Sequence, residues 1–294
     1  MIDHDIAARG LRFRLSRAGT GRALLLLHGW PEFRLTWSRV MPLLADRFDL
    51  IAPDLRGFGE TDKPDAGPSD QAGAEIHAAD MLAVMDALGI ARVGVVAHDV
   101  GAYVAQALAR AAPDRIAGLF FFDCPYPGIG ARWAQPSHLR EIWYQSFHQL
   151  PWAASLVGAS RESCARYIGH FLHHWSGHNQ AAWDGLEAAF VDNFMRPGNL
   201  QGGFNWYISQ NAARLATMRG EAPVLPPIAV PACVRWGIEG PLFPYAWTDR
   251  LGETFAQLDL APFPGAGHFP HVEAPDRAAT EIAAFFTRLG WAAD

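Results

Sequence analysis

The sequence predicts an α/β fold in which a mostly parallel central sheet is flanked by helices and a helical cap is inserted. Short apolar runs bounded by Gly, Pro and Asp alternate with segments of helical period in the first half of the chain. A stretch rich in Trp, His and Phe, with helical spacing, then interrupts this alternation before strand-like runs return. The 294 residues, 50% hydrophobic and 18% charged, are sufficient to bury a core of this size.

The predicted strands are predominantly apolar, as expected for a parallel sheet with both faces covered. They are residues 23–27, 48–52, 93–97, 116–122, 232–236 and 257–260. Helical periodicity is found in residues 76–88, 102–111 and 275–289. The stretch rich in Trp, His and Phe begins near residue 128, and a Pro-rich segment ends it. The predicted organisation is therefore a first core part (1–127), a helical cap (128–222) and a second core part (223–294).

The composition limits the partners of the chain. The net charge is −6, and its 24 basic and 30 acidic residues are mixed, so no basic stripe is present for nucleic-acid phosphates. We find neither a signal-peptide pattern nor an apolar run of about 18 residues. Cys124, Cys164 and Cys233 lack the spacing of metal ligands or of a disulfide framework. We expect a cytoplasmic protein with reduced cysteines and no membrane or nucleic-acid partner; a homodimer is compatible with this composition.

Asp99 stands at the turn between the predicted strand 93–97 and a helix. Ala97 and Gly101 lie two residues before and two residues after it. Small residues at these positions are typical of the strained strand-to-helix turn that exposes a nucleophile. The alternative is that Asp99 only caps the following helix. A carboxylate in this position can attack an electrophilic carbon and form an ester, whereas ordinary ester hydrolysis would be expected to use a serine. The segment therefore indicates displacement at carbon.

The segment His28-Gly29-Trp30-Pro31 directly follows the predicted strand 23–27. In a parallel sheet this places an exposed backbone amide near the turn that holds Asp99. We expect the N–H groups of Trp30 and Val100 to form an oxyanion hole. Gly29 would permit the close approach of the two backbones.

His268 is the candidate base, because it lies on a glycine-flanked loop after the last predicted strand. The order of nucleophile before histidine agrees with this role. Two acids can orient the imidazole: Asp123, which ends the apolar strand 116–122, and Glu239, which follows the next core strand. Asp123 is favoured, since a carboxylate at the end of a fully apolar strand needs a partner, and Glu239 stays as the alternative relay acid.

Four segments carry a resemblance to a known family. They are HGWP (28–31), DLRGFGETDKP (54–64), AHDVG (97–101) and GAGHFPHVEAP (265–275). With them the chain resembles the epoxide hydrolase branch of the α/β-hydrolase fold family over nearly its whole length. The same segments are shared with haloalkane and fluoroacetate dehalogenases. The resemblance therefore implies the fold and an Asp99 nucleophile, while the cap must determine the substrate.

Two motifs in the cap look like the tyrosine motifs of epoxide hydrolases. They are YQSFHQLP (144–151) and NWY (205–207). The resemblance implies that Tyr144 and Tyr207 hold the epoxide oxygen, because an alkoxide leaving group needs a proton and a halide does not. The alternative is that both tyrosines are packing residues. The substrate pocket is expected to include His28, His98, Trp143, Trp206 and Phe269.

Val100 and Tyr103 argue against dehalogenation. Haloalkane dehalogenases have the motif HDWG with a halide-binding Trp, and Val100 stands at the position of that Trp. In fluoroacetate dehalogenases, arginines that bind a carboxylate stand at the positions of Val100 and Tyr103. The hypothesis from the sequence is an epoxide hydrolase that forms a vicinal diol from an apolar epoxide and water, without cofactor or metal. The rivals are a haloalkane or haloacid dehalogenase with the same Asp nucleophile, and a non-catalytic ligand-binding member of the fold.

Overall fold

The computed structural model describes residues 1–65 and 67–292, and it confirms the predicted α/β fold. Eight strands form one sheet in the order β1-β2-β4-β3-β5-β6-β7-β8. Strand β2 is antiparallel to both of its neighbours, and the pairs from β4 to β8 are parallel. The strands are β1 Ile2–Ala8, β2 Leu11–Ala18, β3 Arg22–Leu27, β4 Phe48–Pro53, β5 Val93–His98, β6 Ile116–Phe122, β7 Ala232–Gly237 and β8 Leu258–Phe263.

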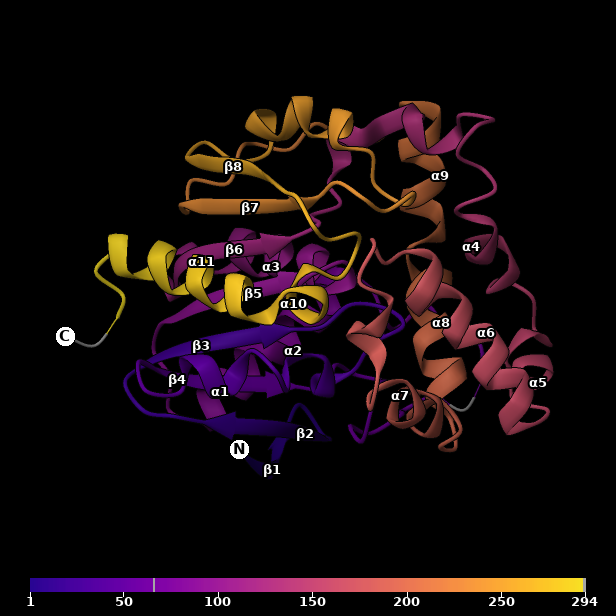
Figure 1. Ribbon diagram of the computed structural model, residues 1–294, viewed down its shortest axis with the longest axis horizontal. Coiled ribbons are helices and arrows are strands. Elements are labelled where there is room, and N and C mark those ends of the chain that lie inside the picture. Colours follow the sequence, from indigo (N-terminus) through magenta and orange to yellow (C-terminus); the bar gives the residue numbers. More distant parts are fainter. Residues whose placement is uncertain (66, 293–294) are drawn as a thin grey trace.

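Helices cover both faces of the sheet and form a separate group beyond its carboxyl edge (Figure 1). The helices on the sheet are α1 Met41–Leu44, α2 Ala74–Ala87, α3 Val100–Ala111, α10 Pro270–Glu273 and α11 Pro275–Arg288. The other group consists of α4 Trp143–Phe147, α5 Ala153–Val157, α6 Arg161–His174, α7 Glu187–Phe194, α8 Asn199–Ser209 and α9 Asn211–Arg219. Short 3-10 helices lie at Arg34–Trp37 (η1), Pro113–Arg115 (η2), Pro127–Ala134 (η3), Gln180–Trp183 (η4) and Tyr245–Glu253 (η5).

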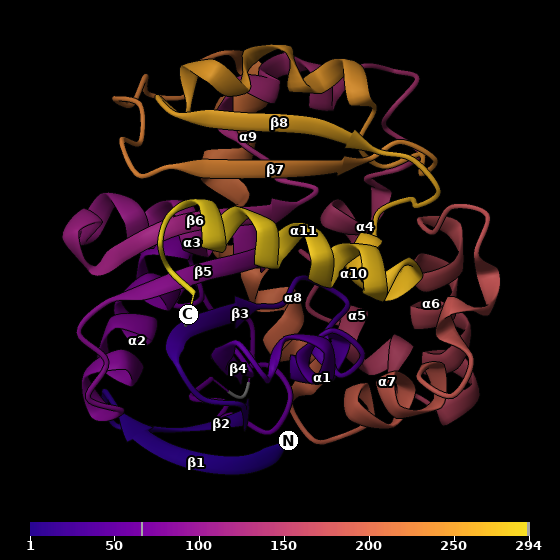
Figure 2. The ribbon, with the colours of Figure 1, turned by 60° about the vertical axis from the view of Figure 1, so that its left-hand side comes forward.

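The parallel strands are mostly apolar on both faces, because successive side chains enter two different cores. In β3, Leu25 and Leu27 pack with residues of α2 and α3, whereas Leu24 and Leu26 pack with residues of α1 and α11. Figure 2 shows α11 and α1 on the near face of the sheet. Continuous apolar runs were therefore sufficient to predict the central strands.

The first two strands were not predicted, because they form a half-exposed edge. Most of β1 is exposed, and three consecutive polar residues, Asp3, His4 and Asp5, occupy its first half. Arg14 of β2 forms ion pairs with Asp3 and Asp5 of β1. The edge is thus held by backbone pairing and surface charge, and it lacks the apolar run by which the central strands were recognised.

The group from η3 to α9, residues 127–219, is called the helical segment below. The arrowheads of β7 and β8 point toward its side of the molecule in Figure 2. Asp99, Asp123 and His268 follow β5, β6 and β8, so they lie at the edge of the sheet that the helical segment faces. Among the helices of the described ranges, none is long and apolar enough to cross a membrane.

Candidate active site

Asp99 occupies a strained turn between β5 and α3. Its backbone has φ 49° and ψ −112°, a conformation that non-glycine residues rarely adopt. The neighbouring backbones approach closely: a Cβ atom on Gly101 would lie 2.4 Å from the Leu27 carbonyl oxygen, and one on Gly29 would lie 2.6 Å from the Cβ of Asp99. Glycine is therefore required on both sides of the Asp99 side chain.

The two carboxylate oxygens of Asp99 have different surroundings. Oδ1 accepts a hydrogen bond of 3.0 Å from the Trp30 amide, while Oδ2 lies 3.7 Å from Nε2 of His268. Burial raises the pKa of Asp99, and the charge of His98 and the amides of Trp30 and Val100 oppose this rise. Oδ1 is thus held by the Trp30 amide, one of the two predicted oxyanion donors, and Oδ2 faces the imidazole of His268.

His268 is oriented by Asp123. Nδ1 of His268 donates to Oδ2 of Asp123 at 2.9 Å, and Oδ1 of Asp123 accepts the Gly237 amide at 2.7 Å. Burial raises the pKa of Asp123, against the opposing effects of the His98 charge and the Gly237 amide. Burial lowers the pKa of His268 well below 6.5, and the positive charge of His98 adds to this effect. A neutral imidazole with a free lone pair on Nε2 has the properties of a general base.

Glu239, the alternative relay acid, lies on a neighbouring loop but does not reach the imidazole of His268. Its Oε1 accepts the backbone amide of Gly265 at 2.9 Å, and its Oε2 lies 3.7 Å from Nε2 of the exposed His178. Glu239 therefore supports the backbone of the histidine loop. The acid in contact with His268 is Asp123, which follows the end of β6.

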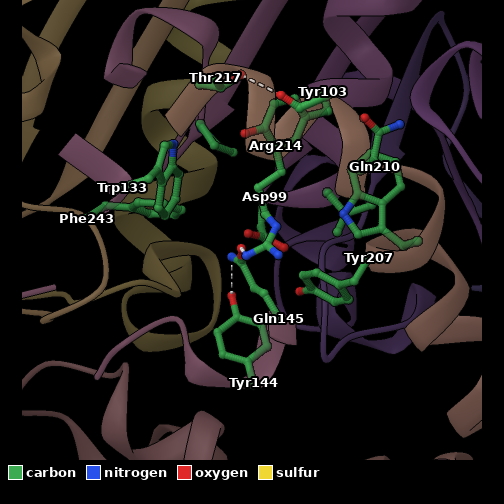
Figure 3. Close-up of a pocket in the computed structure, with 14 residues that line it drawn as sticks. Asp99, Tyr103, Trp133, Tyr144, Gln145, Tyr207, Gln210, Arg214, Thr217 and Phe243 are labelled. Atoms are coloured by element: carbon green, nitrogen blue, oxygen red, sulfur yellow. Dashed lines mark hydrogen bonds between the residues drawn. The ribbon is translucent and has the colours of Figure 1, made fainter. Parts of the chain in front are cut away.

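Tyr144 and Tyr207 come from different helices and meet over Asp99. Tyr144 lies on α4 and Tyr207 on α8, their ring centroids are 5.4 Å apart, and both line a cavity of about 100 Å³ with Asp99 (Figure 3). Tyr144 also stacks on Trp30, with centroids 5.1 Å apart and planes inclined by 5°. Burial raises the pKa of both phenols, so they stay protonated at neutral pH.

Of the five residues expected to line the pocket, only Trp206 lies on the cavity wall. The imidazole of His28 is enclosed and bonds the Gly29 carbonyl and the Leu55 amide. His98 lies beneath the histidine loop, bonded to the carbonyl of His268. Phe269 packs in the core against Trp183, and Trp143 is 42% exposed on the far side of α4. The expectation is corrected for these four, whose side chains point away from Asp99 although their neighbours in sequence line the site.

Several lining residues were missed, and a helical spacing from Tyr207 could have found three of them. Tyr207, Gln210, Arg214 and Thr217 are spaced by three, four and three residues, and all four line the cavity. This spacing is that of one face of a nearly continuous helix, because only Gln210, itself helical in conformation, separates α8 from α9. The cavity is completed by Val100, Tyr103, Pro125, Trp133, Gln145, Ala213 and Phe243.

A buried charge network connects the loop after β3, the end of β5 and the loop that carries His268. Nδ1 of His98 is 2.7 Å from Oε2 of Glu32, and Nε2 is 2.7 Å from the carbonyl oxygen of His268. Both ring nitrogens thus face acceptors, which requires a proton on each. Burial opposes this charge, but the Glu32 carboxylate outweighs it and raises the pKa of His98 to about 9. The imidazolium of His98 therefore ties the oxyanion loop to the histidine loop.

Glu32, His98 and His271 have the ligand types of a metal site and lie close together. The carboxylate oxygens of Glu32 are already engaged: Oε2 accepts the Gly29 amide and His98, and Oε1 accepts the Thr36 hydroxyl and His271. A protonated His98 has no lone pair for a cation. These residues fit a hydrogen-bonded network better than a metal centre.

The ion pair between Glu32 and His98 makes a testable contribution to stability. Because the folded pKa of His98 is about 9 against 6.5 unfolded, its contribution is complete below pH 6.5 and is lost as the pH rises through about 9. The shift corresponds to roughly 3 kcal/mol. Glu32→Gln should therefore cost most stability at or below pH 6.5 and progressively less toward pH 9. Urea unfolding of the wild-type protein and the variant between pH 6.5 and 9 measures this difference in the free energy of unfolding. A difference that does not change with pH would contradict a charged His98 paired with Glu32.

The comparisons with known proteins agree with this geometry. The family model described as alpha/beta hydrolase fold matches residues 22–275. The chain belongs to the alpha/beta hydrolase fold family. The soluble epoxide hydrolase of Corynebacterium sp. (strain C12) is 30% identical to this alpha/beta hydrolase over 97% of each chain. The fluoroacetate dehalogenase of Burkholderia sp. is 33% identical over 49% of each chain.

Solved structures give the same result. The structure of ALR0039 from Nostoc sp. PCC 7120 superposes with a TM-score of 0.86 at 27% identity, covering 97% of this chain and 98% of that one. The epoxide hydrolase CorEH superposes with a TM-score of 0.79 at 25% identity, covering 98% and 99%. The protein is thus an epoxide hydrolase-like alpha/beta hydrolase, and the predicted enzyme class, a hydrolase, is confirmed.

Proposed function

We propose that this alpha/beta hydrolase converts epoxides to vicinal diols through an ester on Asp99. The observation that carries the proposal is the arrangement of one cavity: the Asp99 carboxylate and the phenols of Tyr144 and Tyr207 line the same space. A carboxylate supplies the nucleophile, and two neutral phenols supply the protons that an alkoxide leaving group needs.

In the first step, Oδ2 of Asp99 attacks a carbon of the epoxide ring. The carbon–oxygen bond breaks, its electron pair stays on the oxygen, and a tyrosine hydroxyl transfers a proton to that oxygen. The product is a hydroxyalkyl ester of Asp99. Burial keeps the phenols neutral before the reaction, and the alkoxide is a stronger base than the phenolate that replaces it.

In the second step, Nε2 of His268 removes a proton from water, and the hydroxide attacks the carbonyl carbon of the ester. The amides of Trp30 and Val100 stabilise the oxyanion, and Asp123 stabilises the imidazolium of His268. The ester bond then breaks and its electron pair stays on the departing oxygen. That oxygen takes the proton of the His268 imidazolium, the new carboxyl group of Asp99 returns a proton to the tyrosinate, and the diol leaves. Every step uses side chains of this chain and water.

Loss of the phenols should affect ring opening specifically. Tyr144→Phe and Tyr207→Phe are each expected to lower kcat/KM for styrene oxide about 10- to 100-fold, and the double variant about 10³- to 10⁴-fold, because each phenol partly replaces the other. Tyr245→Phe, which changes a partly exposed tyrosine outside the cavity, is the matched control. Wild-type rates in the double variant would show that the tyrosines only pack.

The test of the proposed function is a panel of styrene oxide, an aliphatic epoxide, a chloroalkane and a haloacetate. Diol formation without halide release is the expected result. Halide release without diol formation would assign the chain to the dehalogenases. Activity on none of the four would favour a ligand-binding role.

A further inference from the structure

Arg214 extends from α9 into the cavity that holds Asp99. Its Nη1 donates to Oε1 of Gln145 at 3.3 Å, and its Nη2 donates to Oδ1 of Asn211 at 2.8 Å. The amide of Gln145 in turn donates to the hydroxyl of Tyr144 at 3.3 Å. Figure 3 shows Arg214 reaching toward Gln145 on the side of the cavity where Tyr144 lies. The guanidinium is thus two hydrogen bonds away from a phenol that is proposed to hold the epoxide oxygen.

The charge of Arg214 is not neutralised within the protein. Both of its hydrogen-bond partners are neutral amides, and its Nε is buried without a partner. In residues 1–65 and 67–292 no carboxylate lies within 4.0 Å of its nitrogens. By contrast, the buried Arg235 pairs with both Asp259 and Glu281. A half-buried guanidinium without a counter-ion, on the wall of a cavity, is suited to an anionic ligand.

We propose that Arg214 binds a carboxylate of the substrate, so that the preferred substrates are epoxides with a carboxylate close to the ring. This inference rests on the proposed epoxide hydrolysis. Arg214 and Tyr144 are both hydrogen-bonded to the side-chain amide of Gln145, so they lie close together. A carboxylate bound to Arg214 and an epoxide oxygen bound to Tyr144 must therefore also be close together in the substrate. A planar carboxylate also matches the paired donors of a guanidinium.

Arg214 offsets the repulsion between Asp99 and a substrate carboxylate. The cavity wall carries one carboxylate, Asp99, and one guanidinium, Arg214. A substrate carboxylate brought beside Asp99 would be repelled without a nearby cation. As the ester forms, the negative charge moves from Asp99 to the tyrosine that protonates the alkoxide. Arg214 lies near Tyr144 through Gln145, so its charge offsets both the tyrosinate and the substrate carboxylate. The side chain therefore favours both binding and ester formation.

The test compares kcat/KM for 3-phenylglycidate, its neutral carboxamide and styrene oxide. Arg214→Met keeps the apolar stem and removes the charge. It is expected to lower kcat/KM for 3-phenylglycidate about 10- to 100-fold, the loss of a charge-assisted hydrogen-bonded pair, while the two neutral epoxides change little. Arg214→Lys should keep part of the preference. Arg219→Met is the matched control on the same helix, because Arg219 is exposed and pairs with Glu221.

Two results would overturn this inference while leaving the proposed function intact. Equal losses for all three epoxides in Arg214→Met would mean that Arg214 only positions Gln145 and Tyr144. Equal kcat/KM values of the wild-type protein for the carboxamide and for 3-phenylglycidate would mean that Arg214 does not recognise the substrate carboxylate. If the wild-type protein opens none of the three epoxides, the proposed function fails and the inference fails with it.

Discussion

Asp99→Asn is expected to lower kcat/KM for epoxides by at least about 10⁴-fold, because the amide keeps the shape of the carboxylate but is a very poor nucleophile. The substitution should not damage the fold. Burial raises the pKa of Asp99 in the folded protein, so the charged form costs stability above the unfolded value, and a neutral isostere relieves that cost. The oxygen of the amide can still accept the Trp30 N–H.

The measurement is steady-state diol formation, with the thermal unfolding midpoint at neutral pH as control. We expect a midpoint equal to or above that of the wild-type protein, together with the loss of activity. Activity within tenfold of wild type, on the order of 1.4 kcal/mol in the barrier, would rule out Asp99 as the nucleophile.

His268→Gln is expected to stop the reaction after its first step. The Asp99 ester should still form, since attack by Oδ2 needs no base, but water would not be activated. Epoxide consumption should therefore end after one equivalent per active site, and steady-state turnover should fall by about 10³- to 10⁴-fold. Intact-protein mass spectrometry should show a mass increase equal to that of the epoxide.

Two variants make this experiment specific. Asp99→Asn combined with His268→Gln should show no mass increase, because the nucleophile is absent. His178→Gln changes an exposed histidine, 93% accessible, and should turn over normally without accumulating an adduct. An unmodified His268→Gln protein that still consumes epoxide would contradict a covalent intermediate on the pathway.

The central fold could be predicted because the same physical feature appears in sequence and in structure. Parallel strands buried on both faces are mostly apolar, and the run from Ile116 to Phe122 is apolar at every position. The strained turn around Asp99 was predictable for a similar local reason, because the small residues Ala97 and Gly101 flank it. The edge strands carry no such signal, since their stability comes from pairing between residues such as Asp3 and Arg14.

The remainder of the site depends on contacts between segments distant in sequence. Asp123 and Glu239 both follow core strands, and only the path of the histidine loop places His268 over Asp123. The pocket was misjudged because the contacts of His28 and His98 cannot be seen in the sequence: His28 bonds the Leu55 amide and His98 bonds the His268 carbonyl. Arg214 was missed because its role appears only where α9 passes Gln145.

The most direct test of the central claim, an ester on Asp99, is a single turnover of styrene oxide by excess wild-type enzyme in oxygen-18 water. In the proposed mechanism water attacks the carbonyl carbon of the ester, so the first diol molecule keeps an oxygen of Asp99. We predict an unlabelled diol and oxygen-18 in the peptide that contains Asp99. A labelled diol from the first turnover, with an unlabelled Asp99 peptide, would show direct attack of water on the epoxide and would contradict the account.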